Sequence, residues 1–167
     1  MKVSGGVERL LADAIRLREA GEHETARTML LALAATHPDD AQVQYQTAWV
    51  HDNLGLEREA VPFYERALAL GLAGEDHCGA LLGLGSTFRT LGEYTRAEET
   101  LRRGMREFPD DRAFPVFLAM TLHNQGRHTP AMELLLRALA ETSDDARIQR
   151  YRRAILFYAD KLDQVWL

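Results

Sequence analysis

Cys78 is the side chain of this sequence closest to a catalytic nucleophile, because His77 precedes it. A thiol becomes an effective nucleophile when a base within hydrogen-bonding reach takes up its proton. Neighbouring residues on a helix point about 100° apart, so these two side chains do not face each other. We therefore predict no cysteine-dependent catalysis. A lone cysteine also excludes a disulfide within the chain.

Histidines are the residues with which this chain could bind a metal ion. Zinc sites on helices pair histidines at positions i and i+4, or use the spacing His-Glu-x-x-His. Neither spacing occurs, and His123 and His128 lie on opposite sides of a predicted turn. We therefore expect no metal site, no cofactor and no enzyme. The histidines considered are His23, His37, His51, His77, His123 and His128.

Two further patterns have a structural explanation that is stronger than a functional one. Gly79, Gly83 and Gly85 lack the preceding strand that a dinucleotide-binding loop requires, so close helix packing explains them better. A run of arginines near the C-terminus could hold an acidic partner or a phosphate backbone. Their helical-wheel angles spread around most of the helix, which favours a solvated face with some salt bridges. These are Arg147, Arg150, Arg152 and Arg153.

The composition bounds the class of protein. The chain has 167 residues, of which 46% are hydrophobic and 27% charged, which favours one folded domain over a disordered chain. Its net charge of -5 argues against binding to nucleic acid or to an anionic membrane surface. No apolar run approaches the ~18 residues of a membrane span, and residues 1–6 show no apolar signal core. We expect a protein of the reducing cytoplasm.

The elements that must carry any site are helices arranged in repeats. Apolar residues recur at i, i+3, i+4 and i+7, and glycines interrupt this helical period at intervals of 34, 37 and 34 residues. These glycines are Gly21, Gly55, Gly92 and Gly126. They define two-helix blocks at 7–40, 41–74, 78–111 and 112–145. Residues 75–77 form an insertion that lengthens a connection or starts the following helix about a turn early.

Paired acids close three of the four blocks. A carboxylate at this position accepts hydrogen bonds from the free amides at the start of the next helix. We therefore interpret these acids first as helix caps. The pairs are Asp39-Asp40, Asp110-Asp111 and Asp144-Asp145.

A 34-residue helix-turn-helix unit with this pattern resembles the tetratricopeptide repeat (TPR). The third block matches through Leu84, Gly85, Phe88, Gly92, Tyr94, Ala97, Leu101 and Pro109. The second matches through Ala48, His51, Gly55, Ala60, Tyr64 and Ala67. The resemblance implies an all-α fold, a right-handed α-solenoid of four units plus a C-terminal capping helix, forming one domain over 1–167.

Residues 146–167 are expected to form that capping helix and a tail. Six residues fall within about 100° on a helical wheel, the width of a stripe that faces a core. A terminal helix with such a stripe would cover the last repeat. The stripe is Ile148, Tyr151, Ile155, Tyr158, Ala159 and Leu162.

The resemblance also implies a concave surface lined by the first helix of each repeat, on which a peptide or helix is held. The residues that map to this lining are Leu11, Ile15, Arg18, Tyr45, Trp49, Asn53, Leu82, Arg89, Val116, Met120 and Asn124. The same mapping adds Asp52, Ser86, Thr90 and His123. It lacks the Lys and Asn pattern of TPRs that clamp a C-terminal carboxylate.

Within this lining, Tyr45 and Trp49 are the expected aromatic anchors, and Arg18 and Arg89 would orient an acidic group. Either aromatic could instead fill the space between adjacent helices. The function we expect is that of a non-enzymatic adaptor with a protein or peptide partner. The alternative is a self-assembling structural protein, a homodimer for example, joined through Leu156, Phe157 and the apolar ending Val165-Trp166-Leu167.

Overall fold

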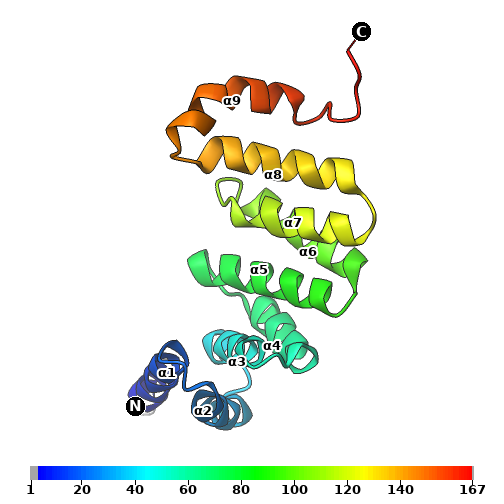
Figure 1. The fold of residues 1–167 in the computed structure, drawn as a ribbon. Helices are drawn as coiled ribbons and strands as arrows, with labels where there is room; N and C mark the ends of the chain where they lie inside the picture. Colours follow the sequence, from blue (N-terminus) through cyan, green and yellow to red (C-terminus); the bar gives the residue numbers. More distant parts are fainter. Residues whose placement is uncertain (1–3, 167) are drawn as a thin grey trace. The chain divides into compact units, whose positions relative to one another are not determined.

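The computed structural model describes residues 4–166, which form nine α-helices and contain no strand (Figure 1). Leu167, part of the predicted apolar ending, lies outside these residues. The chain divides into two compact units, Met1–Leu91 and Gly92–Leu167. The first unit contains α1 (Ser4–Glu19), α2 (His23–Thr36), α3 (Ala41–Asn53), α4 (Glu57–Leu70) and α5 (Gly74–Thr90). The second contains α6 (Tyr94–Glu107), α7 (Ala113–Asn124), α8 (His128–Thr142) and α9 (Ala146–Tyr158).

The helix pairs follow the predicted repeats. Each block contains two helices, and α5 begins at Gly74, so the early start of this helix is the one of the two alternatives for the insertion that is observed. All four turn glycines have positive φ angles between 70° and 83°, a backbone conformation that side chains disfavour. The boundary between the two units falls inside the third predicted block. The single domain over 1–167 stays a prediction.

Acidic side chains start several of the helices. The Asp40 carboxylate accepts hydrogen bonds from the amides of Gln42 and Val43, at 3.0 and 3.1 Å. Asp145 caps α9 in the same way through the amides of Arg147 and Ile148. These contacts confirm the predicted capping role for Asp40 and Asp145, because they satisfy amides that have no partner within their own helix.

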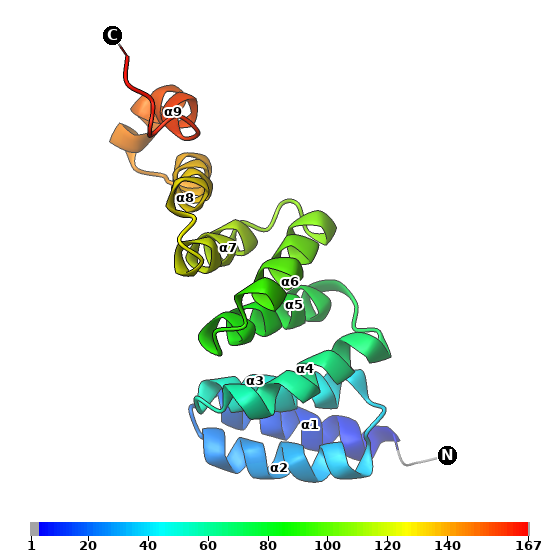
Figure 2. The ribbon, with the colours of Figure 1, turned by 90° about the vertical axis from the view of Figure 1, so that its right-hand side faces the viewer.

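Small residues let the helices of the first unit approach closely. Helix α3 contacts α1, α2, α4 and α5 (Figure 2). Between α1, α2 and α3, the side chains of Ala14, Ala26, Leu30 and Val50 are completely buried together. Burying one leucine in such a core contributes about 1.5–3 kcal/mol.

In the second unit a glycine makes room for an aromatic ring. Gly104 of α6 is buried, and a Cβ atom placed on it would overlap the ring of Phe114 on α7. The TPR pattern has alanine at the position of Gly104, and the glycine here leaves room for the Phe114 ring. Phe114 is completely buried, and it stacks on Phe108 with ring centres 6.3 Å apart.

Helix α9 is present, but its apolar stripe is less covered than the sequence predicts. None of the described residues within the helix is buried, and Tyr151 is 52% exposed. Of the six residues of the stripe, only Ala159, directly after the helix, is fully buried. The side chain of Arg152 instead donates to the carbonyl of Ala140 at the end of α8. The stripe is only partly covered, and among the described helices α8 alone packs against α9.

The remaining aromatic residues of this end pack on one another. Phe157, Tyr158 and Trp166 have ring centres 5.0 to 6.4 Å apart, and each is about half exposed. Within residues 4–166 no helix is long and apolar enough to cross a membrane.

Candidate functional site

Trp49 is an exposed aromatic residue on a helix whose other residues are mostly buried. Eight of the thirteen residues of α3 are buried, whereas the Trp49 side chain in the middle of the helix is 37% exposed. Its neighbours come from the first helices of the repeats in this unit. A large, half-exposed aromatic ring on a rigid helix is typical of a binding anchor.

Arg18 of α1 holds this ring in place. Its guanidinium carbon lies 3.8 Å from the centre of the Trp49 ring, and its Nε donates to Oε1 of Gln46 at 3.2 Å. The Arg18 side chain is only 7% exposed, and this burial lowers the pKa of its guanidinium against the opposing effect of Glu19. Arg18 therefore packs against the Trp49 ring from the interior of the unit. It has little surface left for a partner.

Tyr45 packs against the same tryptophan from its own helix. The two ring centres are 5.5 Å apart, and Tyr45 is 4% exposed. Burial raises the pKa of Tyr45 to about 12, so its hydroxyl is neutral at physiological pH. The Tyr45 ring therefore fills space between helices, which is the alternative that the sequence left open for it.

The half-buried carboxylate of Asp52 joins three helices beside this cluster. Tyr64 of α4 donates its hydroxyl hydrogen bond to Asp52 of α3 at 2.8 Å, and the Thr87 hydroxyl of α5 lies 3.0 Å from both carboxylate oxygens. Burial raises the pKa of Asp52 to about 6, although the hydrogen bonds from Tyr64 and Thr87 oppose this rise. Burial also raises the pKa of Tyr64 strongly.

Two glycines of α5 provide space for these tyrosines. A Cβ atom at Gly79 would overlap the hydroxyl of Tyr45, and one at Gly83 would overlap the end of Tyr64. The glycines therefore allow α5 to approach α3 and α4 closely. This confirms the packing explanation that the sequence favours for them.

The predicted lining residues differ in how much surface they offer. In the first unit Trp49 and Asn53 are exposed, Leu11, Ile15, Leu82 and Arg89 are half-buried, and Arg18 and Tyr45 are buried. In the second unit Val116 and Met120 are half-buried and Asn124 is exposed. The structure thus brings Arg18, Tyr45 and Trp49 together.

The sequence reading missed three contributors to this cluster, namely Gln46, Tyr64 and Thr87. Tyr64 belongs to the repeat pattern, but that pattern does not connect it with Asp52. The signal that could have identified Gln46 is its position three residues before Trp49, which puts the two side chains on the same face of α3.

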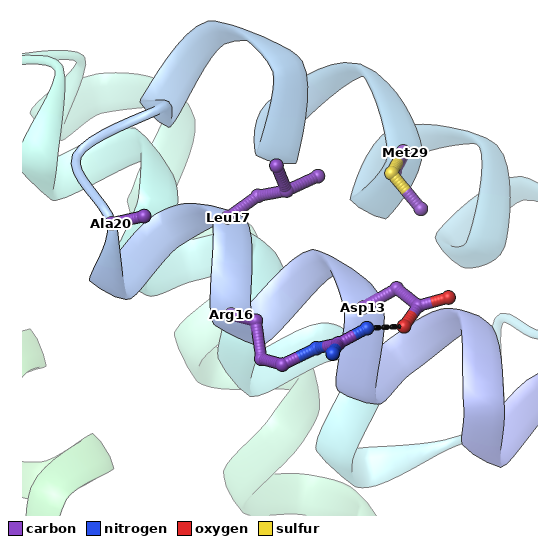
Figure 3. A pocket seen from close by; sticks show the side chains of 5 residues that line it. All are labelled: Asp13, Arg16, Leu17, Ala20 and Met29. Carbon is purple, nitrogen blue, oxygen red and sulfur yellow. Dashed lines mark hydrogen bonds and ion pairs between the residues drawn. The ribbon is translucent and has the colours of Figure 1, made fainter.

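A separate hollow of about 490 Å³ lies between α1 and α2 (Figure 3). Leu17, Ala20 and Met29 line it together with Asp13 and Arg16, which form an ion pair with each other (Figure 3). Met29 also borders a second, apolar hollow of about 280 Å³. The part of the chain that the structure describes has no group of three or more His, Cys, Asp or Glu residues placed to hold a metal ion.

The chain belongs to the tetratricopeptide repeat family. A family model described as Tetratrico peptide repeat matches residues 41–162. None of the curated proteins compared with the chain matches it.

Several solved structures share its fold. MamA from residue 41 to its end, from Desulfovibrio magneticus RS-1, is 18% identical with a TM-score of 0.73, covering 94% of this chain and 87% of that one. YrrB, described as a TPR protein with an unusual peptide-binding site, is 19% identical with a TM-score of 0.70, covering 98% and 86%. The Cut9–Hcn1 hetero-tetramer of the APC/C has a TM-score of 0.75 at 18% identity, covering 92% of this chain and 29% of that one. The TM-scores show a similar fold, and at identities this low the matches show the fold alone.

Proposed function

We propose that this chain is a non-enzymatic interaction module that binds a peptide or a helix of a partner protein on the first-helix side of its repeats. The observation that carries the proposal is the exposure of the Trp49 side chain on α3, a helix whose residues are mostly buried. Exposed indole rings that are surrounded by well-packed neighbours provide much of the binding energy at protein interfaces.

Preorganisation of Trp49 supports this role. The guanidinium of Arg18 stacks on the ring, and Tyr45 packs beside it, so the ring has little rotamer freedom left to lose on binding. A side chain that is already ordered costs less free energy to engage than one that must be immobilised. We infer that an apolar side chain of the partner packs on the exposed part of the indole.

Polar residues around Trp49 would set the orientation of the partner. Asn53 is exposed one turn further along α3 and can exchange hydrogen bonds with a peptide backbone. Arg18 acts as support because of its burial, so we assign the orientation of an acidic group to Arg89. Val116, Met120 and Asn124 occupy the equivalent first-helix positions of the second unit, and we propose a lining role for them there.

The comparison with YrrB supports a peptide as the ligand class, because that protein of similar fold is described with a peptide-binding site.

The proposal places this chain in the cytoplasm and excludes nucleic acid and membrane as partners. Imaging of a fluorescent fusion of the full chain tests the location.

The test begins with affinity purification and mass spectrometry to identify the partner, followed by titration of variants. We expect Trp49→Ala to weaken binding about 30-fold, the effect of losing ~2 kcal/mol at a hot spot. Arg89→Ala should weaken it less. The matched control is Leu31→Ala, because Leu31 is 36% exposed in the same unit but lies on α2. Unchanged affinity in both Trp49→Ala and Arg89→Ala would remove this surface from the account.

The second candidate function is self-assembly through the C-terminal end. It is favoured by the lack of buried residues in α9 and by the exposure of Val165, at 81%, and of Trp166. Light scattering distinguishes the two functions when the full chain is compared with a chain that ends at Leu162. A full chain that is monomeric at every concentration tested rules out assembly, whereas a dimer that the truncation dissociates supports it.

A further inference from the structure

Two exposed histidines face each other across the turn between α7 and α8. His123 lies in the last turn of α7, and His128 is the first residue of α8. Their Nδ1 atoms are 3.2 Å apart, and their ring centres are 4.7 Å apart with the ring planes inclined by 53°. Both side chains are accessible from solvent.

The turn of the repeat fixes this placement. His123 stands three residues before Gly126 and His128 stands two residues after it. The amide of Gly126 donates to the carbonyl of His123, and the amide of Arg127 donates to that of Leu122, both at 2.9 Å. The separation of the two rings therefore follows from a hydrogen-bonded turn with a positive φ at Gly126.

The equivalent positions of the other repeats show that the pairing of imidazoles is particular to the fourth repeat. Around Gly21 the same two positions hold Arg18 and His23, and around Gly55 they hold Asp52 and Glu57. Neither pair supplies two imidazole nitrogens. The repeat geometry brings these positions close, and the fourth repeat alone places two borderline-soft ligands there.

The distance between the two nitrogens suits a bound metal ion. Zinc binds histidine nitrogen at about 2.0–2.1 Å, so two such ligands at a tetrahedral angle lie about 3.3 Å apart. The observed 3.2 Å between the Nδ1 atoms is close to this value. Imidazole nitrogen is a good ligand for zinc, copper and nickel.

The neighbouring charges also allow a cation at this place. Arg127, which precedes His128, has its guanidinium within 2.9 Å of both carboxylate oxygens of Glu98. Glu98 also pairs with Arg102, so its carboxylate offsets part of the positive charge of Arg127. This reduces the repulsion between Arg127 and a metal ion beside His128.

We propose that His123 and His128 bind one divalent transition-metal ion, of which Zn²⁺ is the first candidate, through their Nδ1 atoms. Water completes the coordination, since the described residues offer no third ligand among His, Cys, Asp and Glu close enough. The site is weaker than a closed four-ligand site and exchanges its metal with solution. Metal binding at this turn does not depend on peptide binding. The sequence alone supports the expectation of no metal site, because a His-x4-His spacing across a turn is not a helix motif.

The test is calorimetric titration of the full, untagged chain with Zn²⁺, together with Co²⁺ binding followed by visible absorption. Each protein carries Cys78→Ser, which removes the one thiol as a competing ligand. We expect one zinc per chain, and affinity at least tenfold lower in His123→Ala and in His128→Ala. The matched control is His23→Ala, since His23 occupies the position of His128 in the first repeat. The zinc affinity of this control should equal that of the background chain, which carries Cys78→Ser alone.

The alternative is a hydrogen bond between two imidazoles with no metal. Nitrogen-15 spectra of the histidine rings distinguish the two, because bound zinc should shift only the signals of His123 and His128. Zinc should also raise the melting temperature of the background chain and not that of the double variant, which carries both His123→Ala and His128→Ala. Both substituted residues are exposed, and circular dichroism checks that the variants are folded. Undetectable zinc binding by the background chain, or equal affinity in the double variant, would overturn the proposal.

Discussion

The guanidinium of Arg18 lies 3.8 Å from the centre of the Trp49 ring, although the two residues belong to different repeats. Arg18 is buried and Trp49 is exposed, so the contact connects the interior of the first unit with its surface. Because a buried cation–π contact contributes about 2 kcal/mol, it is strong enough to fix the orientation of the indole.

Replacement of Arg18 by leucine should therefore affect binding and stability together. The variant loses the contact with Trp49 and leaves the Gln46 amide oxygen without its donor, at a cost of about 1–3 kcal/mol. Urea denaturation measures this loss, and titration of the partner should show weaker binding. Wild-type affinity in a folded Arg18→Leu chain would show that Trp49 needs no support from Arg18.

The half-buried carboxylate of Asp52 should give the stability of the protein a measurable pH dependence. Folding raises its pKa from 3.8 to about 6, so the folded chain keeps this proton where the unfolded chain has lost it. The contribution of Asp52 to stability is therefore greatest below about pH 4, falls as the pH rises towards about 6, and is then level. Tyr64 and Thr87 face the carboxylate as donors, and Glu57 adds a repelling charge.

Asp52→Asn isolates this contribution, because asparagine keeps an acceptor and has no charge. We expect the variant to be more stable than the wild type by about 1–2 kcal/mol at pH 7 and nearly equal to it at pH 3.5. Urea denaturation at both pH values is the measurement. A stability difference that is the same at the two pH values would contradict the assignment to Asp52.

Two glycine-to-alanine substitutions in helices should have opposite effects. At Gly104 the new methyl group overlaps the ring of Phe114, so we expect a loss of about 1–3 kcal/mol. At Gly6 of α1 nothing lies within 4 Å of the new methyl group, and the variant should gain about 0.5–1 kcal/mol. Thermal denaturation compares them. Equal effects at the two sites would show that Phe114 moves aside freely.

Much of the fold could be predicted because its signals are local. Gly21, Gly55, Gly92 and Gly126 mark turns through their own backbone conformation, and Asp40 caps a helix through the two amides that follow it. Each of these depends on residues a few positions apart. The turns and this helix cap could therefore be predicted from spacing alone, whereas the early start of α5 is one of two alternatives that the spacing leaves open.

The features that could not be predicted depend on contacts between helices. A helical wheel shows that Tyr151 belongs to an apolar stripe of α9, but it cannot show whether another helix covers that stripe. The burial of Arg18 under Trp49 depends on the spacing of α1 and α3. Likewise, the approach of His123 to His128 depends on the path of a turn, which the i, i+4 rule within one helix does not describe.

The aspartate that caps α3 should matter more than its neighbour in sequence. Asp40→Ala removes two hydrogen bonds from the start of α3 and should cost about 1 kcal/mol. Asp39 is largely exposed and pairs with Arg66 at the surface, so Asp39→Ala should cost less than about 0.5 kcal/mol. Urea denaturation of the two variants separates a cap from a surface ion pair. A larger loss in Asp39→Ala would contradict this order.

The most direct test of the interaction surface is the fluorescence of Trp49 during binding. A Trp166→Phe chain has Trp49 as its one tryptophan, so its emission reports on this ring alone. If a partner packs on the exposed indole, its addition should shift the emission to shorter wavelength and protect it from acrylamide quenching. Unchanged emission and quenching while the partner is bound would show that it binds elsewhere, and the account of this surface would be wrong.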